Sequence, residues 1–415
     1  MAKVLVVGGG GREHAIVHAL SKSNKVEKIF AAPGNAGIAN LAECLNIKDV
    51  EVEKIVAFAK DNAIDLVVVG PEASLALGII DALRNAGIKA FGPSKAAAQI
   101  EASKNFAKDL MSKYNIPTAR YEVFTDYKEA IEYVKISPIP TVIKYDGLAA
   151  GKGVVVAMSL EEADNALKDM LLDDKFGHGK VVIEEYLEGP EFSFMCFVNG
   201  ENVYPLEMAQ DHKRAYDNDL GPNTGGMGAY SPLPFITKED YEYALNEIMI
   251  PTAKAMVMDG CPFTGVLYGG LMKTKRGIKV IEFNARFGDP ETEVVLPRLT
   301  SDIYDAFVAI CDGKEPKLTW DNKYTIGIVL ASKGYPGDYK KGYVIEGADK
   351  ENIYHMGTKR NENGELVING GRVLFAVASG DTLEDANKKA NELVKTIKCE
   401  NLFHRTDIGA KAYRK

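Results

Sequence analysis

The chain lacks the features that mark secreted, zinc-knuckle and membrane proteins. Its five cysteines are odd in number and none lie close together in sequence, so neither a disulfide framework nor a zinc knuckle is indicated. No apolar run is long enough to span a bilayer. The N-terminus has neither an apolar signal core nor a cleavage site. These absences predict a cytoplasmic protein without a membrane partner.

A concentrated charge of one sign is also missing. The net charge is −8 and there is no long run of one sign, which argues against duplex nucleic acid as a partner because such binding needs a basic footprint. An acidic average still allows a local basic pocket for phosphate. Of the six histidines, His14 and His18 are four residues apart, but the acid and the third ligand of a zinc enzyme are missing, so we expect most of the histidines to be structural. The length of 415 residues predicts roughly two to four domains.

The first hundred residues alternate between strand-like and helix-like segments. Valine-rich or apolar runs at 4–7, 66–69 and 88–91 each end in a glycine turn, and helical patterns lie between them, one from about Arg12 to Ser21. Such alternation predicts a parallel, helix-flanked sheet. In these sheets ligands bind at the carboxyl ends of the strands, where the glycine turns fall. Residues 94–113 predict one long connecting helix.

After Pro117 the pattern changes to antiparallel strand pairs. Asn199-Gly200 is a strong two-residue hairpin signal. Ser159 with Glu162 predicts a capping box at the start of a helix, and Thr382 predicts an N-cap whose box is imperfect because Asp385 replaces Glu or Gln. Strands are expected at 141–144, 154–157, 181–186, 192–198, 203–208, 263–272, 278–284, 326–331 and 373–378.

The first candidate site is the segment GGGGREHA at 8–15, between a strand and a helix. Adjacent glycines let backbone N–H groups approach a ligand, the helix N-terminus favours an anion, and Arg12 adds a charged donor. The dinucleotide fingerprint needs glycine where Glu13 or His14 stands, so a phosphate fits better than a nicotinamide dinucleotide. The alternative is a tight structural turn, and this segment alone does not decide between them.

The second candidate is KYDGLAAGKG at 144–153. A glycine loop with Lys144 and Lys152 near its ends suits a triphosphate, although Gly153 stands where a Walker A loop needs Ser or Thr. An exposed hairpin tip would explain the glycines but not the lysines. We expect the loop from Gly147 to Gly153 to be mobile without nucleotide and ordered with it, since glycines leave little intrinsic order.

The third candidate is VIEFNARFGDPE at 280–291. Strand alternation predicts that Glu282 and Asn284 share one face, while Ile281 and Phe283 enter a core together on the other. A carboxylate and an amide oxygen suit Mg²⁺, which commonly shares few protein ligands with nucleotide phosphates. Arg286 could hold a carboxylate or a transferring phosphoryl group. The alternative is an ordinary solvated strand face, against which the Asn argues because strands deplete it.

The fourth candidate is the polar stretch DHKRAYDNDLGPNTGGMG at 211–228. Polar loops of this kind often carry function. The alternative is a flexible linker, which fits poorly with strand-like segments on both sides.

Together these segments resemble the phosphoribosylamine–glycine ligases, also called glycinamide ribonucleotide synthetases, of the ATP-grasp superfamily. The resemblance runs nearly end to end and includes APGNAG (32–37), VGPE (69–72), SKNF (103–106), VIEEYLEGPE (182–191), GPNTGGMGAYSP (221–232), KGYPGDY (333–339) and NGGRVL (369–374). It implies an α/β plus α+β fold, with nucleotide held between two α+β lobes. The expected domains are a Rossmann-like domain at 1–103, an ATP-grasp domain at 104–320 with a mobile nucleotide-covering subdomain at about 118–190, and a small α+β domain at 321–415.

The resemblance also implies roles for individual residues. ATP would be held by phosphate contacts, an adenine hinge and a ribose acceptor: Lys104, Lys144, Gly147, Gly151, Lys152, Gly153, Glu184, Glu185, Tyr186, Leu187 and Glu191. Mg²⁺ or Mn²⁺ would be bound by Glu282 and Asn284. Phosphoribosylamine would contact Gly9, Gly10, Gly11, Arg12, Asn35, Gly70, Pro71 and Glu72. Glycine and the reacting phosphate would be held by Asp211, Lys213, Arg286 and Asp289, the first three of them catalytic. Tyr145 departs from the small residue more usual in the family.

The implied activity is ATP-dependent ligation of glycine to 5-phosphoribosylamine through glycyl phosphate, yielding glycinamide ribonucleotide, ADP and phosphate in purine (IMP) biosynthesis. ATP must activate the carboxylate because oxide is a poor leaving group, and cations with a metal must neutralise the meeting anions. One alternative is an ATP-grasp ligase acting on formate or bicarbonate. Others are a nucleotide-binding regulator with a dead site and a dinucleotide oxidoreductase, both disfavoured by the residues above. A monomer or a weak dimer is expected.

Overall fold

The computed structural model describes residues 1–147, 153–173 and 179–413. Most of the predicted nucleotide loop, including Gly151 and Lys152, lies outside the described residues, as does the prediction of its ordering. Among the described helices, none combines the length and the apolar character needed to cross a membrane.

The N-terminal part is the predicted parallel sheet, with strand order β3-β2-β1-β4-β5. Val4 to Val7 of β1 are fully or almost fully buried, as expected for a strand covered by helices on both faces. Gly70 N–H donates to Val7 O at 3.0 Å, so the turns after β1 and β4 lie side by side. The strands are β1 Ala2–Gly8, β2 Val26–Pro33, β3 Glu43–Cys44, β4 Leu66–Val69 and β5 Ala90–Phe91. The helices are α1 Gly11–Ser21, the 3₁₀ turn Ile38–Asn40, α2 Val52–Asp61, α3 Glu72–Leu77 and α4 Ile79–Asn85.

The single long helix predicted over residues 94–113 is wrong. The structure has two helices, α5 Gln99–Ala102 and α6 Lys104–Lys113, separated by Ser103. Ser103 has an extended backbone (φ −127°, ψ 115°), and its hydroxyl accepts from Phe106 N–H at 3.1 Å. A serine that caps the following helix ends the preceding one. The same hydroxyl donates to Asp146 at 3.0 Å. This bond links α6 to the end of strand β7 (Thr141–Tyr145), which leads into the predicted nucleotide loop.

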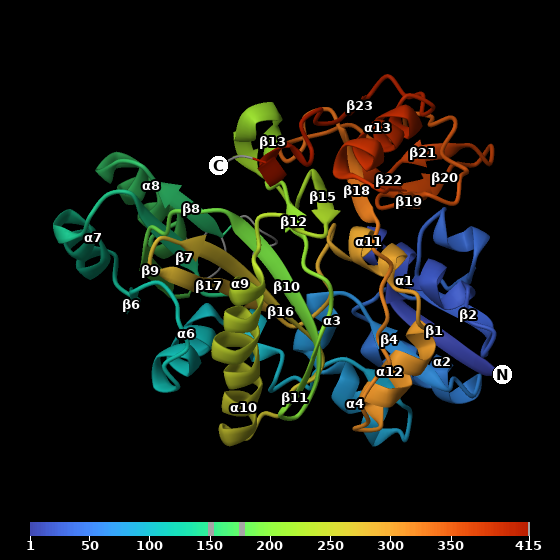
Figure 1. Ribbon diagram of the computed structural model, residues 1–415, viewed down its shortest axis with the longest axis horizontal. Helices are drawn as coiled ribbons and strands as arrows, with labels where there is room; N and C mark the ends of the chain where they lie inside the picture. The colour runs from blue at the N-terminus through green and yellow to red at the C-terminus, as the bar shows by residue number, and fades with distance from the viewer. Residues whose placement is uncertain (148–152, 174–178, 414–415) are drawn as a thin grey trace.

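Residues 118–190 contain a separate antiparallel sheet, with strand order β6-β9-β7-β8. Figure 1 shows this sheet and its two helices projecting from the rest of the molecule. It has its own core, which includes Val134, Ile143, Leu167 and Ile183. The elements are β6 Tyr121–Phe124, α7 Tyr127–Ile136, β7 Thr141–Tyr145, β8 Val154–Ala157, α8 Leu160–Leu171 and β9 Val181–Glu185.

The predicted capping box at α8 is only half formed. Ser159 accepts from Glu162 N–H at 3.2 Å as predicted. The Glu162 carboxylate, however, accepts from Met158 N–H at 2.8 Å. At α13 the prediction is confirmed, because the Thr382 hydroxyl accepts from Asp385 N–H at 3.1 Å.

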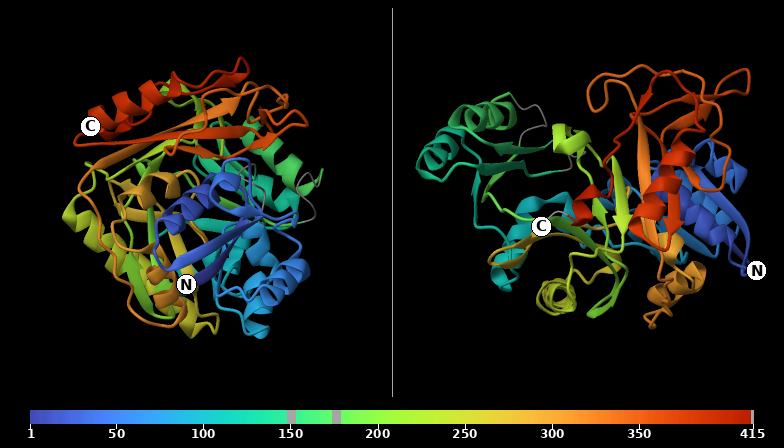
Figure 2. Two further views of the ribbon diagram at one scale, coloured as in Figure 1. Left: turned by 90° about the vertical axis from the view of Figure 1, so that its right-hand side faces the viewer. Right: turned by 45° about the horizontal axis from the view of Figure 1, so that its top comes forward.

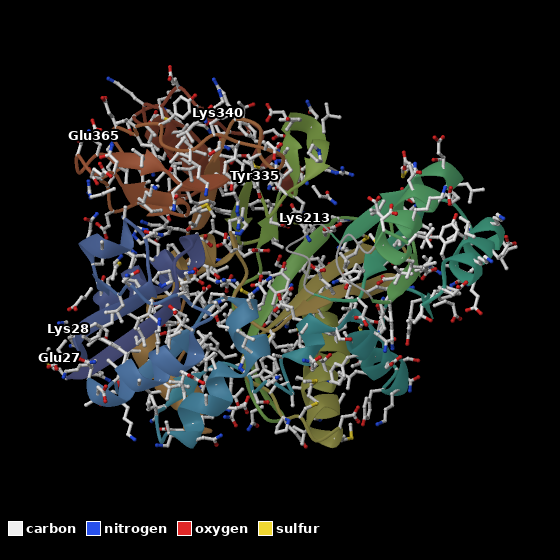
Figure 3. The ribbon with its side chains drawn as sticks, turned by 180° about the vertical axis from the view of Figure 1, so that it is seen from behind. Glu27, Lys28, Lys213, Tyr335, Lys340 and Glu365 are labelled. Carbon is white, nitrogen blue, oxygen red and sulfur yellow. The ribbon has the colours of Figure 1, made fainter. Side chains whose placement is uncertain are left out.

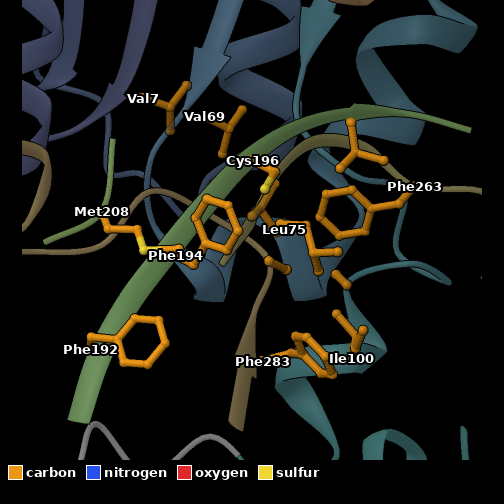
Figure 4. Packing of buried hydrophobic residues seen from close by; sticks show 14 of the residues in the cluster. Val7, Val69, Leu75, Ile100, Phe192, Phe194, Cys196, Met208, Phe263 and Phe283 are labelled. Carbon is orange, nitrogen blue, oxygen red and sulfur yellow. The ribbon is translucent and has the colours of Figure 1, made fainter. Parts of the chain in front are cut away.

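The central sheet has the order β11-β10-β16-β17 and carries the main core. The predicted hairpin is present, with Gly200 in the left-handed region at φ 58°. Figure 4 shows Phe192, Phe194 and Cys196 of β10 packed toward Phe283 and the N-terminal sheet. The elements are β10 Glu191–Asn199, β11 Asn202–Pro205, α9 Lys238–Tyr243, the π-helix Ala244–Met249, α10 Ile250–Met258, β16 Thr264–Thr274 and β17 Gly277–Asn284.

Strand β17 departs from the simple alternation that the sequence predicts. Gly270 pairs with Glu282 but Leu271 pairs with Val280, so Ile281 is an extra residue in a bulge. The prediction that Ile281 and Phe283 enter one core is therefore wrong. Phe283 lies in the main core with Val280, whereas Ile281 packs against the small cluster of Ala119, Leu187 and Met272.

A fourth sheet, with order β12-β15-β18-β22-β19, joins the 211–228 stretch to the C-terminal part. Because four strands form within or beside that stretch, the flexible-linker alternative is wrong. Figure 2 shows this sheet covering one side of the molecule. The strands are β12 Gln210–Asp211, β13 Arg214–Tyr216, β14 Leu220–Asn223, β15 Gly228–Ser231, β18 Tyr324–Ser332, β19 Ile353–His355, β20 Thr358–Arg360, β21 Leu366–Ile368, β22 Arg372–Gly380 and β23 Leu402–Phe403. The helices are α11 Thr292–Val295, α12 Ile303–Cys311 and α13 Leu383–Val394, with 3₁₀ turns at Asp217–Asp219, Leu296–Arg298 and Ala410–Tyr413.

Candidate functional site

The charges of four cations from separate segments act on Glu282 near the end of β17. Burial alone would raise its pKa, but Lys213, Lys144, Lys104 and Arg286 together hold that pKa below its usual range. The carboxylate is therefore charged at neutral pH and outnumbered by cations. Such an excess of positive charge in a partly buried site suits a polyanion. Figure 3 shows Lys213 near the middle of the molecule, between the C-terminal part and the central strands.

Lys144 is held by the bulge in β17. Its ammonium donates to Ile281 O at 2.8 Å and pairs with Glu184 at 2.9 Å. The extra residue in the strand thus presents a carbonyl to the lysine instead of to the ladder. Lys104 of α6 donates to Gly147 O at 3.1 Å, at the start of the predicted nucleotide loop, and Lys144 lies in β7, the strand that leads into that loop.

Lys108 is a site residue that the sequence reading missed. It lies one turn after Lys104 on α6, pairs with Glu184 at 3.0 Å and donates to Thr118 at 2.8 Å. Burial lowers its pKa to about 8, partly offset by Glu184. Its i, i+4 spacing from Lys104 was the available signal, because such residues share a helix face. Glu184 therefore joins two buried lysines.

The predicted adenine hinge offers an apolar floor and backbone groups. Leu187 is buried in the small cluster with Ile281. The Glu185 carboxylate is occupied by Arg120, Arg276 and Lys279 at 3.0–3.2 Å, and these partners outweigh burial and lower its pKa to about 2.

The remaining residues of the predicted nucleotide site differ in their exposure to solvent. Glu191 lies 3.6 Å from the Lys213 ammonium and is 41% exposed, so it remains accessible to a ligand. Tyr186 is exposed. Tyr145, by contrast, is buried in the core of the projecting lobe, where a Cβ at Gly147 or Gly179 would meet its ring at 2.8 Å.

Glu282 and Asn284 present the hard oxygen donors that Mg²⁺ or Mn²⁺ takes. Asn284 Oδ1 has only a long contact, 3.4 Å from an Arg286 nitrogen. Within the described part of the chain, no group of three or more His, Cys, Asp or Glu residues could hold a metal by itself. The residues therefore fit a cation whose other ligands come from substrate phosphates and water.

Arg286 is fixed by two acids, of which only Glu72 was predicted. Its guanidinium lies 2.9 Å from Glu101 and 3.5 Å from Glu72, and these acids raise its pKa against the effect of burial. Glu101 also accepts from Ala285 N–H at 2.7 Å, which fixes the residue before Arg286. Nothing in the sequence marked Glu101, since it lies inside the segment predicted as one continuous helix.

The glycine turns after β1 and β4 pack closely around Glu13. Its carboxylate accepts from Gly10 N–H and from Arg12 Nε, each at 2.7 Å. A Cβ at Gly70 would come within 1.9 Å of the same carboxylate, so only glycine fits there. The tight-turn explanation therefore accounts for part of this motif. A phosphate at this loop stays a prediction.

Other predicted substrate residues lie beside that turn. The Asn35 side chain joins two loops by donating to Gly9 O at 2.9 Å and to His355 O at 2.8 Å. Asp289 pairs with Arg372 at 2.9 Å and accepts from Arg12 N–H at 3.3 Å. Arg372 was not singled out, although it lies in the NGGRVL segment. Pro71 is the N-cap of α3 and brings Glu72 toward the site.

Asp211 and Lys213 form an acid–base pair at the edge of β12. Burial raises the pKa of Asp211 to about 7, with Lys213 opposing the shift. Asp211, Glu191 and Glu282 raise the pKa of Lys213 well above its usual value against the effect of burial. The lysine is therefore a fixed cation, whereas Asp211 can exist with or without its proton near neutral pH.

Glu293 on α11 lies fully buried behind the glycine turn. Neither of its carboxyl oxygens has a hydrogen-bond partner among the described residues. A Cβ at Gly11 would meet its Oε1 at 2.5 Å. Burial, then the nearby Asp289, raise its pKa well above the usual value, so the group is held as a neutral acid.

This burial predicts a pH-dependent stability difference for Glu293→Gln. An unfolded glutamate has a pKa of about 4.3, whereas the folded one is raised, so wild-type stability falls as the pH rises between the two values. The neutral glutamine has no such loss. We expect similar urea unfolding at pH 4.5, and a gain of about 1–3 kcal/mol for Glu293→Gln at pH 8. Glu362→Gln, at an exposed position, serves as the control. A difference that does not change with pH would contradict the neutral-acid assignment.

The phosphoribosylglycinamide synthetase family matches through its N domain at residues 2–101, its ATP-grasp (A) domain at 102–292 and its C domain at 325–411. The phosphoribosylamine–glycine ligase of Halalkalibacterium halodurans is 55% identical over 99% of this chain and 97% of its own length.

Two solved structures extend the comparison. The phosphoribosylamine–glycine ligase of Thermotoga maritima superimposes with a TM-score of 0.87 at 35% identity, covering 98% of this chain and 99% of that one. The biotin carboxylase domain of the Hydrogenobacter thermophilus 2-oxoglutarate carboxylase, solved with MgADP and bicarbonate, has a TM-score of 0.72 at 18% identity. It covers 97% of this chain and 91% of its own and shows likeness of fold alone.

Proposed function

This chain belongs to the phosphoribosylglycinamide synthetase family, and from that membership we propose how its residues perform the family's reaction. The reaction is the ATP-dependent ligation of glycine to 5-phosphoribosylamine, a step of purine biosynthesis. The observation that carries the residue assignment is the convergence of Lys104, Lys144, Lys213 and Arg286 on the Glu282 carboxylate.

ATP binds between the projecting lobe and the central sheet. Its phosphates meet Lys104 and Lys144, which gives Lys144 a new partner while Lys108 continues to neutralise Glu184. The adenine rests on the apolar cluster that contains Leu187, and its edge meets backbone groups of the hinge. The lobe moves as a unit over the nucleotide because it has a core of its own.

Glu282 and Asn284 would hold Mg²⁺ or Mn²⁺, and the ion would supply charge neutralisation for the transferred phosphoryl group. Arg286, fixed by Glu101 and Glu72, orients the glycine carboxylate and the γ-phosphate. Lys213 neutralises the charge that develops between the two anions.

In the first step a glycine carboxylate oxygen attacks the γ-phosphorus, the bond to the β-phosphate oxygen breaks, and ADP leaves. The ribosylamine nitrogen then attacks the glycyl carbonyl and expels phosphate. Asp211 has a pKa of about 7 and lies beside Lys213, so it can accept the proton that the amine loses. Glu72 and the turns at Gly9–Arg12 and Gly70 hold the phosphoribosylamine, and Asp289 contributes to the glycine side of the site.

The substrates are small molecules that diffuse in the cytoplasm. We propose that the enzyme acts there as a monomer or a weak dimer, without a nucleic-acid or membrane partner.

The test of this function is ADP release measured with each substrate omitted in turn. We expect release only when glycine and phosphoribosylamine are both present, with one glycinamide ribonucleotide formed per ADP. Formate and bicarbonate, the substrates of the nearest alternative, should not replace glycine. ADP release with either of them at the glycine rate would overturn the assignment.

A further inference from the structure

The segment that carries Asp211 and Lys213 is held from its other side by the last part of the chain. His212 directly follows β12, and its backbone continues the pairing with the segment before β15: its N–H donates to Gly228 O at 2.9 Å and its carbonyl accepts from Met227 N–H at 2.8 Å. Neighbouring side chains along such a paired segment point to opposite sides, so His212 points away from Asp211 and Lys213. His212 is fully buried, and its Nε2 accepts from Gly409 N–H at 3.2 Å. Burial keeps the imidazole neutral by lowering its pKa to about 3.

Arg405 makes the second connection. Its side chain is 1% exposed, and one terminal nitrogen donates to Arg214 O at 3.0 Å, directly after Lys213. The same guanidinium pairs with Asp219 at 3.1 Å and makes two bonds of 2.8 Å to Asp407. Two of these partners, Arg214 O and Asp219, lie in the loop, and Asp407 orients the guanidinium toward them. A buried arginine held in this way fixes the position of the loop that it contacts.

Residues on either side of Arg405 extend the contact. Asp407 accepts from Asn218 N–H at 2.9 Å, and Thr406 N–H donates to Asp217 at 2.8 Å. We call residues 405–409 the tail clamp. Figure 1 shows this last part of the chain beside β13, although almost two hundred residues separate them in sequence.

The clamped loop has a backbone that needs outside support. Asn218 and Asp219 are consecutive non-glycine residues in the left-handed region, at φ 60° and 57°. Each such residue is unfavourable by itself and persists where its surroundings over-determine it. The tail clamp supplies those surroundings.

We propose that Arg405 and His212 are positioning residues for glycine activation. By holding the backbone of residues 212–219 from behind, they set the separation of the Asp211 and Lys213 side chains from the bound glycine and the γ-phosphate. The effect on catalysis rests on the proposed roles of Asp211 and Lys213, whereas the mechanical contact does not.

The main test compares His212→Leu with His212→Gln. Leucine keeps the volume but removes the acceptor for Gly409 N–H, whereas the glutamine oxygen can reach the place of Nε2. We expect His212→Leu to raise KM for glycine by about tenfold and to change KM for ATP by less than about twofold. The reason is that a catalytic group displaced by about 1 Å contacts its substrate poorly although the site stays folded. His212→Gln should stay within about threefold of wild type.

Arg405→Met is expected to have a larger effect of the same kind. Arg360→Met is the matched control, because Arg360 lies in the same C-terminal part with a long 3.8 Å ion pair to Asp349. If Arg405→Met does not fold, the His212 pair still decides the question. Equal increases in KM for glycine and for ATP would overturn the proposal. So would the same KM values for His212→Leu and His212→Gln.

A second readout separates this proposal from the proposed function. Amide hydrogen exchange over residues 211–219 should accelerate in His212→Leu relative to wild type, and should stay unchanged in Arg360→Met. Unchanged exchange in His212→Leu would show that the tail does not hold the segment. If exchange accelerates but Lys213→Met leaves glycine kinetics unchanged, the role given to Lys213 fails while the mechanical contact stands.

Discussion

Glu282→Gln is expected to lower turnover about a thousandfold or more while the protein stays folded. The carboxylate is the acid on which the charges of Lys104, Lys144, Lys213 and Arg286 all act, and it is the predicted anchor of the metal. Removing its charge takes away the metal's anionic ligand and leaves four cations without their common partner. Losing one group that stabilises transition-state charge typically costs about 10²–10³ in rate, and loss of a metal ligand adds to that.

Asn284→Ala should act in the same direction but less strongly, and the double variant should show little further loss. Residues that serve one metal act as a unit, so their effects are not additive. Part of the Glu282→Gln defect should be recovered at high Mn²⁺ concentration, which a structural defect would not show. Glu207→Gln, which removes an acid paired with Arg298 at 2.8 Å, controls for the loss of an ion pair. Normal turnover in a folded double variant would contradict the metal assignment.

Much of the architecture was predictable because its signals are local. The valine run of β1, the glycine after it and the Asn199-Gly200 hairpin each depend on a few neighbouring residues. The Thr382 cap is local in the same sense. The wrong prediction over 94–113 came from a local competition as well, since Ser103 can either continue a helix or cap the next one. Its hydrogen bond to Asp146, 43 positions away, favours the cap.

The sequence singled out the cations and the carboxylate that the structure brings together, but it did not indicate the residues that hold them in place. Glu101 fixes Arg286, although nothing in its own neighbourhood distinguishes it from a surface glutamate. Lys108 and Arg372 likewise act through partners far away in sequence. The bulge at Ile281 depends on the register with β16, and a strand pattern read alone carries no register. The residues that hold functional side chains in place are determined by tertiary contacts. These contacts cannot be read from the order of residues in the sequence.

The bulge in β17 also shows how strand register positions two groups of the predicted site. A regular β17 would place the Ile281 side chain in the main core beside Phe283. The Ile281 carbonyl would then accept a backbone hydrogen bond from the neighbouring strand. The extra residue instead sends the Ile281 side chain to the cluster that contains Leu187 and leaves its carbonyl for Lys144. One inserted residue thus serves both the predicted adenine floor and the predicted phosphate lysine.

Glycine labelled with ¹⁸O in its carboxylate is expected to transfer one label atom to each phosphate released. In the proposed reaction the carboxylate oxygen that attacks the γ-phosphorus becomes the bridging atom of glycyl phosphate. When the ribosylamine nitrogen attacks the carbonyl, the carbon–oxygen bond breaks and that oxygen leaves with the phosphate. The observation that favours this route is that Arg286 and Lys144 both act on the charge of Glu282, the predicted metal ligand, so that one phosphoryl group and one glycine carboxylate are expected to meet there.

The competing routes send the label elsewhere. If the carboxylate were adenylated, the label would enter AMP and pyrophosphate would be released; if ATP were hydrolysed separately, the phosphate would carry no label. Mass spectrometry of the phosphate after complete turnover distinguishes the three cases, and ATP with unlabelled glycine in ¹⁸O-water controls for hydrolysis by solvent. ADP together with singly labelled phosphate is the expected result. Unlabelled phosphate, or AMP with pyrophosphate, would contradict the acyl-phosphate mechanism even though the family membership would stand, because other ATP-dependent ligations can reach the same amide by those routes.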